Sequence, residues 1–234
     1  LYDLFAPEGW VNEDVFAYSN ASGGERGLVL YNNAPRRARG WIRESAAYAE
    51  KTAAGKRLAR CTLAEGLGID TGDGRYVSFR EHGSGLEYLR SSREVAERGL
   101  AVDLAPYGCQ VFLDFAEMID DARGSWSRLC ERLAGQPVQS LGRALREMEL
   151  TPVRDAFRDV LVAVRVTLVA LRSPEPMPAI AAFARFAEAA AARAPGTIDA
   201  GACSLAFGRR LRALAELARW KAPAAALAAP GRRA

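Results

Sequence analysis

Residues 75–115 decide the fold that the sequence predicts; they read RYVSFREHGSGLEYLRSSREVAERGLAVDLAPYGCQVFLDF. Apolar and polar residues alternate in short runs at 76–79, 86–89, 100–105 and 111–115. His82-Gly83-Ser84-Gly85 separates the first two runs as a hairpin loop, and Pro106-Tyr107-Gly108 separates the last two as a turn. Four strands of this kind indicate a β-meander or one half of a β-sandwich, a scaffold in which no catalytic group is visibly organised.

The flanking segments extend this pattern into an α+β chain. Residues 10–20 and 26–33 predict a further hairpin around a Gly-rich loop, whereas alanine, leucine and arginine dominate after residue 118. Strands first and helices afterwards predict an N-terminal antiparallel β-sandwich followed by an all-α helical segment. We therefore expect a β-sandwich at 1–118, a helical subdomain at 119–222 and a disordered tail at 223–234, which is rich in alanine and proline.

Capping residues mark the expected helices. Ser125 is suited to cap a helix that ends at Gly135, Ser140 caps another to about 149, and Thr151-Pro152 is typical of a helix start. Further helices are expected at 178–194 and 204–220. The helix after Pro152 has an apolar stripe of Val153, Phe157, Val160, Leu161, Val164, Leu168 and Leu171. Charged residues interrupt it, so it is expected to be a buried core helix and not a membrane span.

Charge and cysteine content limit the partners. Residues 201–234 carry seven basic side chains against one acidic side chain, while residues 1–200 carry 25 against 27, so the basic excess lies at the C-terminal end. This distribution lacks the basic stripe of a nucleic-acid-binding domain, and neither nucleic acid nor a membrane is expected as a partner. The four scattered cysteines form no metal motif and are typical of reduced thiols in a cytoplasmic protein, with Cys109 as a small core residue.

The beginning of the chain indicates a longer protein. It starts at Leu1, and residues 1–5 read LYDLF, as in the interior of an element. We expect the chain to be a fragment. No leader segment can be recognised at such a start.

Acidic clusters and the single histidine are the candidates for catalysis. The clusters are Glu13 with Asp14, and Asp114, Glu117, Asp120 and Asp121. Adjacent carboxylates on a strand point to opposite faces, and acidic residues at a domain seam commonly cap the next helix, so the structural interpretation is favoured for both. His82 lies before a Gly-Ser-Gly turn without a nucleophile motif and is expected to be an exposed turn residue.

Cofactor and ligand motifs are few. The glycines at 66–68 and 72–74 lack the Lys-Ser/Thr ending of a phosphate loop, so no cofactor is expected. Four aromatic residues of the β part are able to stack on sugar rings if they are exposed on one sheet face: Trp10, Tyr18, Tyr31 and Trp41. The alternative, which we favour from the sequence, is that these rings pack in the core.

The β part also resembles a known region. The segments WVNEDVFAYSN, GGERGLVLYNNAPRRARGWIRESAAYAEK, RYVSFREHGSGLEYLRSSRE and GLAVDLAPYGCQVFLDF look like the region downstream of the catalytic barrel in large bacterial α-amylase-family glycosidases. The resemblance covers residues 1–118, and RGWIRESA and EYLRSSRE are its most specific blocks. The helical remainder resembles an appended segment of the same large proteins.

This resemblance implies a parent enzyme that acts on α-glucans. The catalytic carboxylates of the family lie on the barrel, and no barrel motif is found here, so no catalytic residue is carried over. The expected function is a non-catalytic accessory region that stabilises the barrel or contacts polysaccharide, with Trp10 and Trp41 as the candidate sugar contacts. The alternative is a protein-interaction module that uses the helical face.

Overall fold

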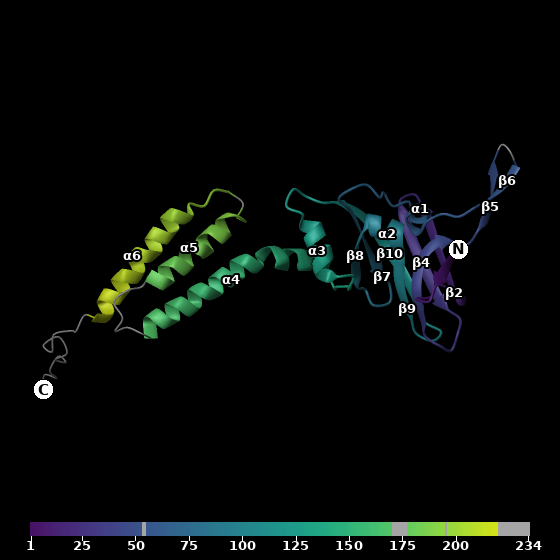
Figure 1. The fold of residues 1–234 in the computed structure, drawn as a ribbon. Coiled ribbons are helices and arrows are strands. Elements are labelled where there is room, and N and C mark those ends of the chain that lie inside the picture. The colour runs from purple at the N-terminus through teal and green to yellow at the C-terminus, as the bar shows by residue number, and fades with distance from the viewer. Residues whose placement is uncertain (53–54, 170–176, 195, 220–234) are drawn as a thin grey trace, which may run out of the picture. The chain divides into compact units, whose positions relative to one another are not determined.

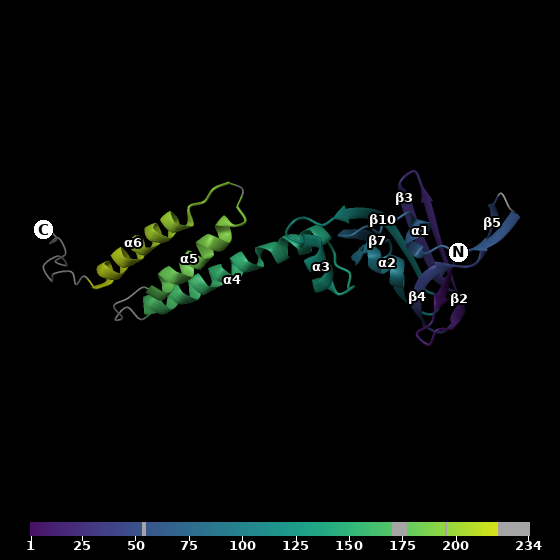
Figure 2. The same cartoon turned by 45° about the horizontal axis from the view of Figure 1, so that its top comes forward.

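The computed structural model describes residues 1–52, 55–169, 177–194 and 196–219. The chain is an α+β protein that divides into two compact units, Leu1–Met148 and Glu149–Ala234 (Figures 1 and 2). The tail expected to be disordered, at 223–234, lies outside the described residues. None of the helices within the described part of the chain is long and apolar enough to cross a membrane.

A single curled antiparallel sheet forms the body of the first unit. Its eight strands follow the order β8-β7-β10-β3-β2-β1-β4-β9. Their bounds are Tyr2–Phe5 (β1), Val11–Ser22 (β2), Glu25–Asn32 (β3), Ala38–Ser45 (β4), Arg75–Glu81 (β7), Glu87–Ser91 (β8), Leu100–Leu104 (β9) and Cys109–Ile119 (β10). A separate hairpin of β5 (Tyr48–Thr52) and β6 (Gly55–Ala59) projects from this body (Figure 1).

The two Gly-loop hairpins expected from the sequence are present. β2 pairs with β3 from Val15–Asn32 to Ser22–Glu25, and β7 pairs with β8 from Tyr76–Ser91 to Arg80–Glu87. In both hairpins the connecting segment is short and contains glycine, which lets the chain reverse its direction locally. These local signals are therefore sufficient to predict both pairs.

The expected meander of four consecutive strands is wrong, because β9 and β10 do not pair with each other. β9 lies at the edge beside β4, whereas β10 lies inside the sheet between β3 and β7. Asn32 holds the corner between them: its side-chain Nδ2 donates to the carbonyl oxygens of Arg36 at 2.7 Å and Ala105 at 2.9 Å. This buried amide fixes the connection that carries the chain from one part of the sheet to the other.

Two short helices cover the inner face of the sheet. α1 (Leu63–Leu67) begins with a capping box between Thr62 and Glu65, and α2 (Ser92–Arg98) ends at Gly99. Their apolar residues join one core with the inward side chains of the strands, among them Leu4, Leu28, Leu30, Ile42, Leu63, Leu67, Val77, Val95 and Leu104. The curled sheet thus encloses a single core.

The first unit continues past the expected domain boundary at residue 118. α3 (Ser125–Leu133) and the start of α4 (Leu141–Val169) pack on β8, where Leu89, Leu129 and Leu141 form a second buried cluster. α3 extends nearly as predicted, but Gly124 and not Ser125 is its N-cap. The compact unit ends later than the sequence indicates because this cluster ties the first helices to the sheet.

The predicted helix start at Thr151-Pro152 is wrong. α4 begins at Leu141, where Ser140 Oγ accepts from the Arg143 N–H at 3.3 Å as expected of a cap, and continues through Pro152. The stripe that follows is buried only in part: Val160 is buried, whereas Phe157 is 46% and Leu161 is 55% exposed. The side chain of Leu168 and the whole of Leu171 lie outside the described residues. Phe157 contacts Phe186, with ring centroids 5.3 Å apart, and the described residues of the second unit leave Leu161 exposed.

The described part of the second unit is otherwise formed by α5 (Met177–Ala191) and α6 (Ala200–Arg219). Ala179 and Ala182 are buried, and the rings of Phe183 and Phe207 stack with centroids 4.1 Å apart. Small residues allow the two helices to approach closely. Both helices agree with the expected ranges to within a few residues.

Candidate functional site

Trp41 lies on the outward face of β4 and is the centre of the candidate site. On this strand Ile42 is buried and Trp41 and Arg43 are exposed, because successive side chains of a strand point to opposite faces. Trp41 lies opposite Phe5 of β1 on one side and opposite Ala101 of β9 on the other. The indole is 41% exposed. The site is therefore carried by paired strands and is held by the sheet.

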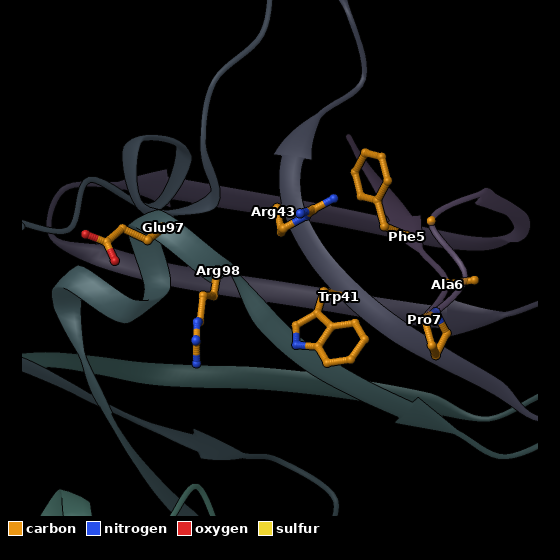
Figure 3. Close-up of a pocket in the computed structure, with 8 residues that line it drawn as sticks. Phe5, Ala6, Pro7, Trp41, Arg43, Glu97 and Arg98 are labelled. Carbon is orange, nitrogen blue, oxygen red and sulfur yellow. The ribbon is translucent and has the colours of Figure 1, made fainter.

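A cavity of about 400 Å³ lies beside this ring (Figure 3). Its walls come from the end of β1, the following turn, β4 and the end of α2, with Phe5, Ala6, Pro7, Gly9, Trp41, Arg43, Glu97 and Arg98 as the lining residues. We call it the Trp41 pocket. Its volume falls in the range of roughly 300–1,000 Å³ that is usual for small-molecule sites.

Two glycines bring the walls of the Trp41 pocket together. A Cβ on Gly40 would lie 2.1 Å from the carbonyl oxygen of Phe5, and a Cβ on Gly99 would lie 1.9 Å from that of Ile42. Gly99 also has a φ of 75°, which disfavours other residues. These close approaches place the end of α2 directly against the backbone of β4, so Arg98 reaches the pocket although it is distant from Trp41 in sequence.

Charged side chains surround the aromatic rings. The guanidinium of Arg43 lies 4.7 Å from the centroid of the Phe5 ring, a cation–π contact. Glu97 pairs with Arg93 one helical turn earlier at 3.1 Å. Arg98 and the indole of Trp41 are drawn side by side in Figure 3, with the Glu97 carboxylate directed away from them. The pocket thus combines flat apolar rings with hydrogen-bond donors.

The structure places Trp10 outside this pocket. Trp10 lies in the turn between β1 and β2, where its carbonyl accepts from the Ala6 N–H at 2.8 Å, and its side chain is 53% exposed. The expectation that Trp10 and Trp41 are packed in the core is wrong for both. Of the two candidate sugar contacts, only Trp41 lines a cavity.

Tyr18 and Tyr31 are also exposed, on the outer face of the neighbouring strands. Tyr31 lies opposite Phe16, and Tyr18 lies opposite Val29, so these rings share one face of β2 and β3. Cys109 pairs with Tyr31 and is exposed, which corrects the expectation of a buried core cysteine. The inner positions of β2 are taken by small residues, and the larger rings therefore face outward.

Most of the carboxylates in the expected clusters form ion pairs or cap a helix. Asp14 pairs with Arg36, Asp114 with Arg80 at 3.2 Å and Glu117 with Arg26 at 2.6 Å. Asp120 accepts from the backbone N–H groups at the start of α3.

Asp121 accepts at the same helix start from the side chain and N–H of Ser125, and these bonds lower the pKa of Asp121. The helix-capping interpretation of Asp120 and Asp121 is thereby confirmed. Glu13 is exposed.

His82 is an exposed residue of the β7–β8 turn, as expected. Its backbone N–H donates to Val111 at 2.8 Å. The buried carboxylate of this turn is Glu81, which the sequence did not single out. Burial raises the pKa of Glu81, but hydrogen bonds from Ser84 and the N–H of Gly83 outweigh it and lower the pKa below its ordinary value.

Of the lining residues that carry a ring or a guanidinium, only Trp41 was a candidate from the sequence, and Phe5, Arg43 and Arg98 were not. Arg43 could have been assigned to the same face as Trp41, because residues two apart on a strand share a face. Phe5 and Arg98 are brought in by strand pairing and by the close contact at Gly99, for which no local signal exists.

Comparison with known proteins adds no relative. No protein-family model, no curated protein and no solved structure matches the chain.

Proposed function

We propose that this chain is a non-catalytic accessory region of an α-amylase-like glycosidase, and that it contacts α-glucan through the Trp41 pocket. The observation that carries the proposal is an exposed tryptophan that forms one wall of a cavity of about 400 Å³ next to charged donors. The sequence resemblance supplies the class of parent enzyme and its substrate. The proposal includes a catalytic barrel elsewhere in the parent protein and a cytoplasmic location, which four free cysteines support.

The physical basis is the two-sided character of a sugar ring. The C–H face of a pyranose is apolar and covers an aromatic ring, while its hydroxyl groups point sideways to hydrogen-bonding partners. Trp41 provides the flat ring, and the nearby Arg43 and Arg98 provide donors at its margin. Arginine suits this position because its planar fork offers several N–H groups in fixed directions.

An accessory role also agrees with the state of the carboxylates. Glycoside hydrolysis needs a pair of carboxyl groups that flank the scissile bond. In the candidate clusters Asp14, Asp114 and Glu117 are held by arginines, and Asp120 and Asp121 cap α3. The Trp41 pocket itself is lined by one carboxylate, Glu97, which pairs with Arg93.

Affinity electrophoresis in amylopectin gels tests the proposal. The wild-type chain is expected to be retarded, and Trp41→Ala is expected to lose that retardation with an unchanged melting temperature. Trp10→Ala is the matched control, since it removes an indole that is also exposed but lies outside the pocket. A wild-type chain that migrates as in a gel without polysaccharide, or a Trp41→Ala variant that is retarded as strongly as wild type, would contradict it.

A protein-interaction module is the second candidate, favoured by the apolar surface of the helical unit. Several large apolar residues are exposed there, namely Leu161, Val162, Val166, Leu205 and Leu214. Exposed apolar patches commonly mark interaction sites, and Leu161, Val162 and Val166 lie within two turns of α4. If Leu161→Lys abolishes association with the remainder of the parent protein while glucan retardation persists, the helical unit is the interaction module and the sheet is the glucan contact.

A further inference from the structure

The outward face of β2 and β3 changes its character along the two strands. Directly paired residues of two strands share a face, and the inward positions of this pair are buried, as at Ala17 and Leu30. The outward pairs follow in the order Phe16–Tyr31, Tyr18–Val29, Asn20–Gly27 and Ser22–Glu25. This face is therefore aromatic at one end and polar toward the β2–β3 loop.

A hollow lies where the aromatic end and the polar end meet. Gly27 has no side chain, and Leu113 of β10 lies beside it: a Cβ on Gly27 would lie 3.3 Å from Leu113 Cδ2. The cavity that results has a volume of about 310 Å³, and its walls include Tyr18, Asn20, Ser22, Glu25, Val29 and Leu113. We call it the Gly27 hollow. A glycine inside a strand often marks a place where a ligand approaches the backbone closely.

The polar side chains of the Gly27 hollow are available to a ligand. Among the described residues, none lies within hydrogen-bond or ion-pair distance of the side chains of Asn20, Ser22 and Glu25. Arg26, the cation of the lining, is already engaged, because it pairs with Glu117 at 2.6 Å and donates to the Gly68 carbonyl at 2.9 Å. The hollow thus offers an amide, a hydroxyl and a carboxylate beside the exposed ring of Tyr18.

We propose that the Gly27 hollow is a second sugar contact, with a neutral sugar ring on Tyr18 and its hydroxyl groups on Asn20 and Glu25. The assignment of this sugar to an α-glucan rests on the proposed function. A neutral sugar fits because the Asn20 amide donates and accepts, while the Glu25 carboxylate accepts from hydroxyl groups. An anionic ligand would instead face Glu25, with Arg26 already paired. Small-molecule sites commonly combine apolar walls with a few polar groups in this way.

The two sugar contacts lie on the outward side of the sheet and far apart. Phe5 pairs with Val11 of β2 and with Trp41 of β4, so the row through Trp41 crosses β2 seven residues before Tyr18. At about 3.3 Å per residue, this is a separation of roughly 23 Å along the strand. Maltotriose, with three sugar rings, is too short to occupy both contacts at once. A polymer is long enough, and the linkage of two weak contacts raises the overall affinity.

Titration with maltotriose, followed by the amide signals in NMR spectra, tests the two contacts separately. Gly9 lines the Trp41 pocket and Gly27 lines the hollow, so their amides are the two reporters. Both signals are expected to shift in the wild-type chain. Tyr18→Ala is expected to remove the shift at Gly27 alone, and Trp41→Ala the shift at Gly9 alone. Phe16→Ala is the matched control, because it removes an exposed ring of the same face outside the hollow, and both shifts are expected to persist.

Two further variants test the hollow without the loss of a ring. Glu25→Ala is expected to weaken maltotriose binding at the Gly27 reporter about two- to tenfold, as for the loss of one hydrogen bond, with Glu13→Ala as an exposed control on β2. Gly27→Val fills the hollow with a side chain. Like Tyr18→Ala, it is expected to lose retardation in amylopectin gels, because one remaining contact is too weak to hold the polymer. Wild-type retardation of both variants would overturn the second contact.

The second contact and the proposed function fail separately. A shift at Gly9 without one at Gly27 would overturn the second contact and leave the Trp41 pocket as a glucan contact. A shift at Gly27 without one at Gly9 would support the Gly27 hollow and contradict the role proposed for the Trp41 pocket. Signals at Gly27 that move with protein concentration in the absence of sugar would show that a second copy covers this face, and would overturn the sugar assignment.

Discussion

The side chain of Asn32 can be tested by replacing it with aspartate, a change of one NH₂ group for one oxygen. Asn32 is fully buried, and Nδ2 donates to the carbonyl oxygens of Arg36 and Ala105 while Oδ1 accepts from the Ala34 N–H at 3.2 Å. In Asn32→Asp the two carbonyl oxygens lose their donor and face a carboxylate oxygen instead. Each buried acceptor without a partner costs about 1–3 kcal/mol, so the variant is expected to lose about 2–6 kcal/mol of unfolding free energy.

Urea unfolding followed by tryptophan fluorescence measures this loss. Trp10, Trp41 and Trp126 all lie in the first unit, so the signal reports mainly on it. The adjacent Asn33→Asp is the matched control, because Asn33 is exposed and the charge change is the same; its effect is expected to stay within about 0.5 kcal/mol.

The pH dependence gives a second check on Asn32→Asp. Burial beside two carbonyl oxygens raises the folded-state pKa of the new carboxyl group above its ordinary value. The group regains a donor when it is protonated, so the deficit relative to the wild type is expected to shrink as the pH falls through that raised pKa. Equal unfolding midpoints for Asn32→Asp and Asn33→Asp at pH 7 would refute the assigned role of Asn32.

Two further predictions concern catalysis and pH. The purified chain is expected to release no reducing sugar from starch, glycogen or maltooligosaccharides, and turnover abolished by substitution of a single Asp or Glu of the chain would contradict this. The lowered pKa of Glu81 means that its stabilising contribution is present above the unfolded-state pKa and is lost as the pH falls through the folded-state pKa. Glu81→Gln is therefore expected to melt below wild type at pH 7 and to approach it at about pH 3, with Glu13→Gln as an exposed control; a difference in melting temperature that persists at low pH would count against it.

Local signals predicted the strands and the two hairpin pairs, but not the pairing of strands that are distant in the sequence. The β2–β3 and β7–β8 hairpins follow from short Gly-containing loops, which act over a few residues. The separation of β9 from β10 depends on the corner held by Asn32, a contact between residues far apart in the sequence. Local signals were also insufficient in the helical part. The Thr151-Pro152 pair predicted a helix start, but α4 begins at Leu141 and continues past Pro152.

Only part of the candidate site could be predicted, because the sequence does not show which face of a strand is buried or which distant segments meet. Period-two alternation does not say which face is buried when both faces are apolar, as on β2, where Ala17 is buried and Phe16 and Tyr18 are exposed. The sequence favoured a buried Trp41 ring, whereas the structure leaves it 41% exposed. Arg98 could not be assigned to the same site because only the close contact at Gly99 brings α2 to β4.

The interior position of β10 has a consequence for how the chain folds during its synthesis. Within the eight-stranded sheet β10 is the last strand to leave the ribosome, yet it joins β7 to β3. Until it emerges, the other strands of this sheet can form only a β7–β8 ribbon and a five-stranded sheet of β3, β2, β1, β4 and β9, each with an open edge where β10 belongs. Such open edges recruit strands of other chains. A truncation before Cys109 is therefore expected to produce two unjoined sheets that are prone to aggregate, whereas one after Ile119 leaves the eight strands joined in one sheet.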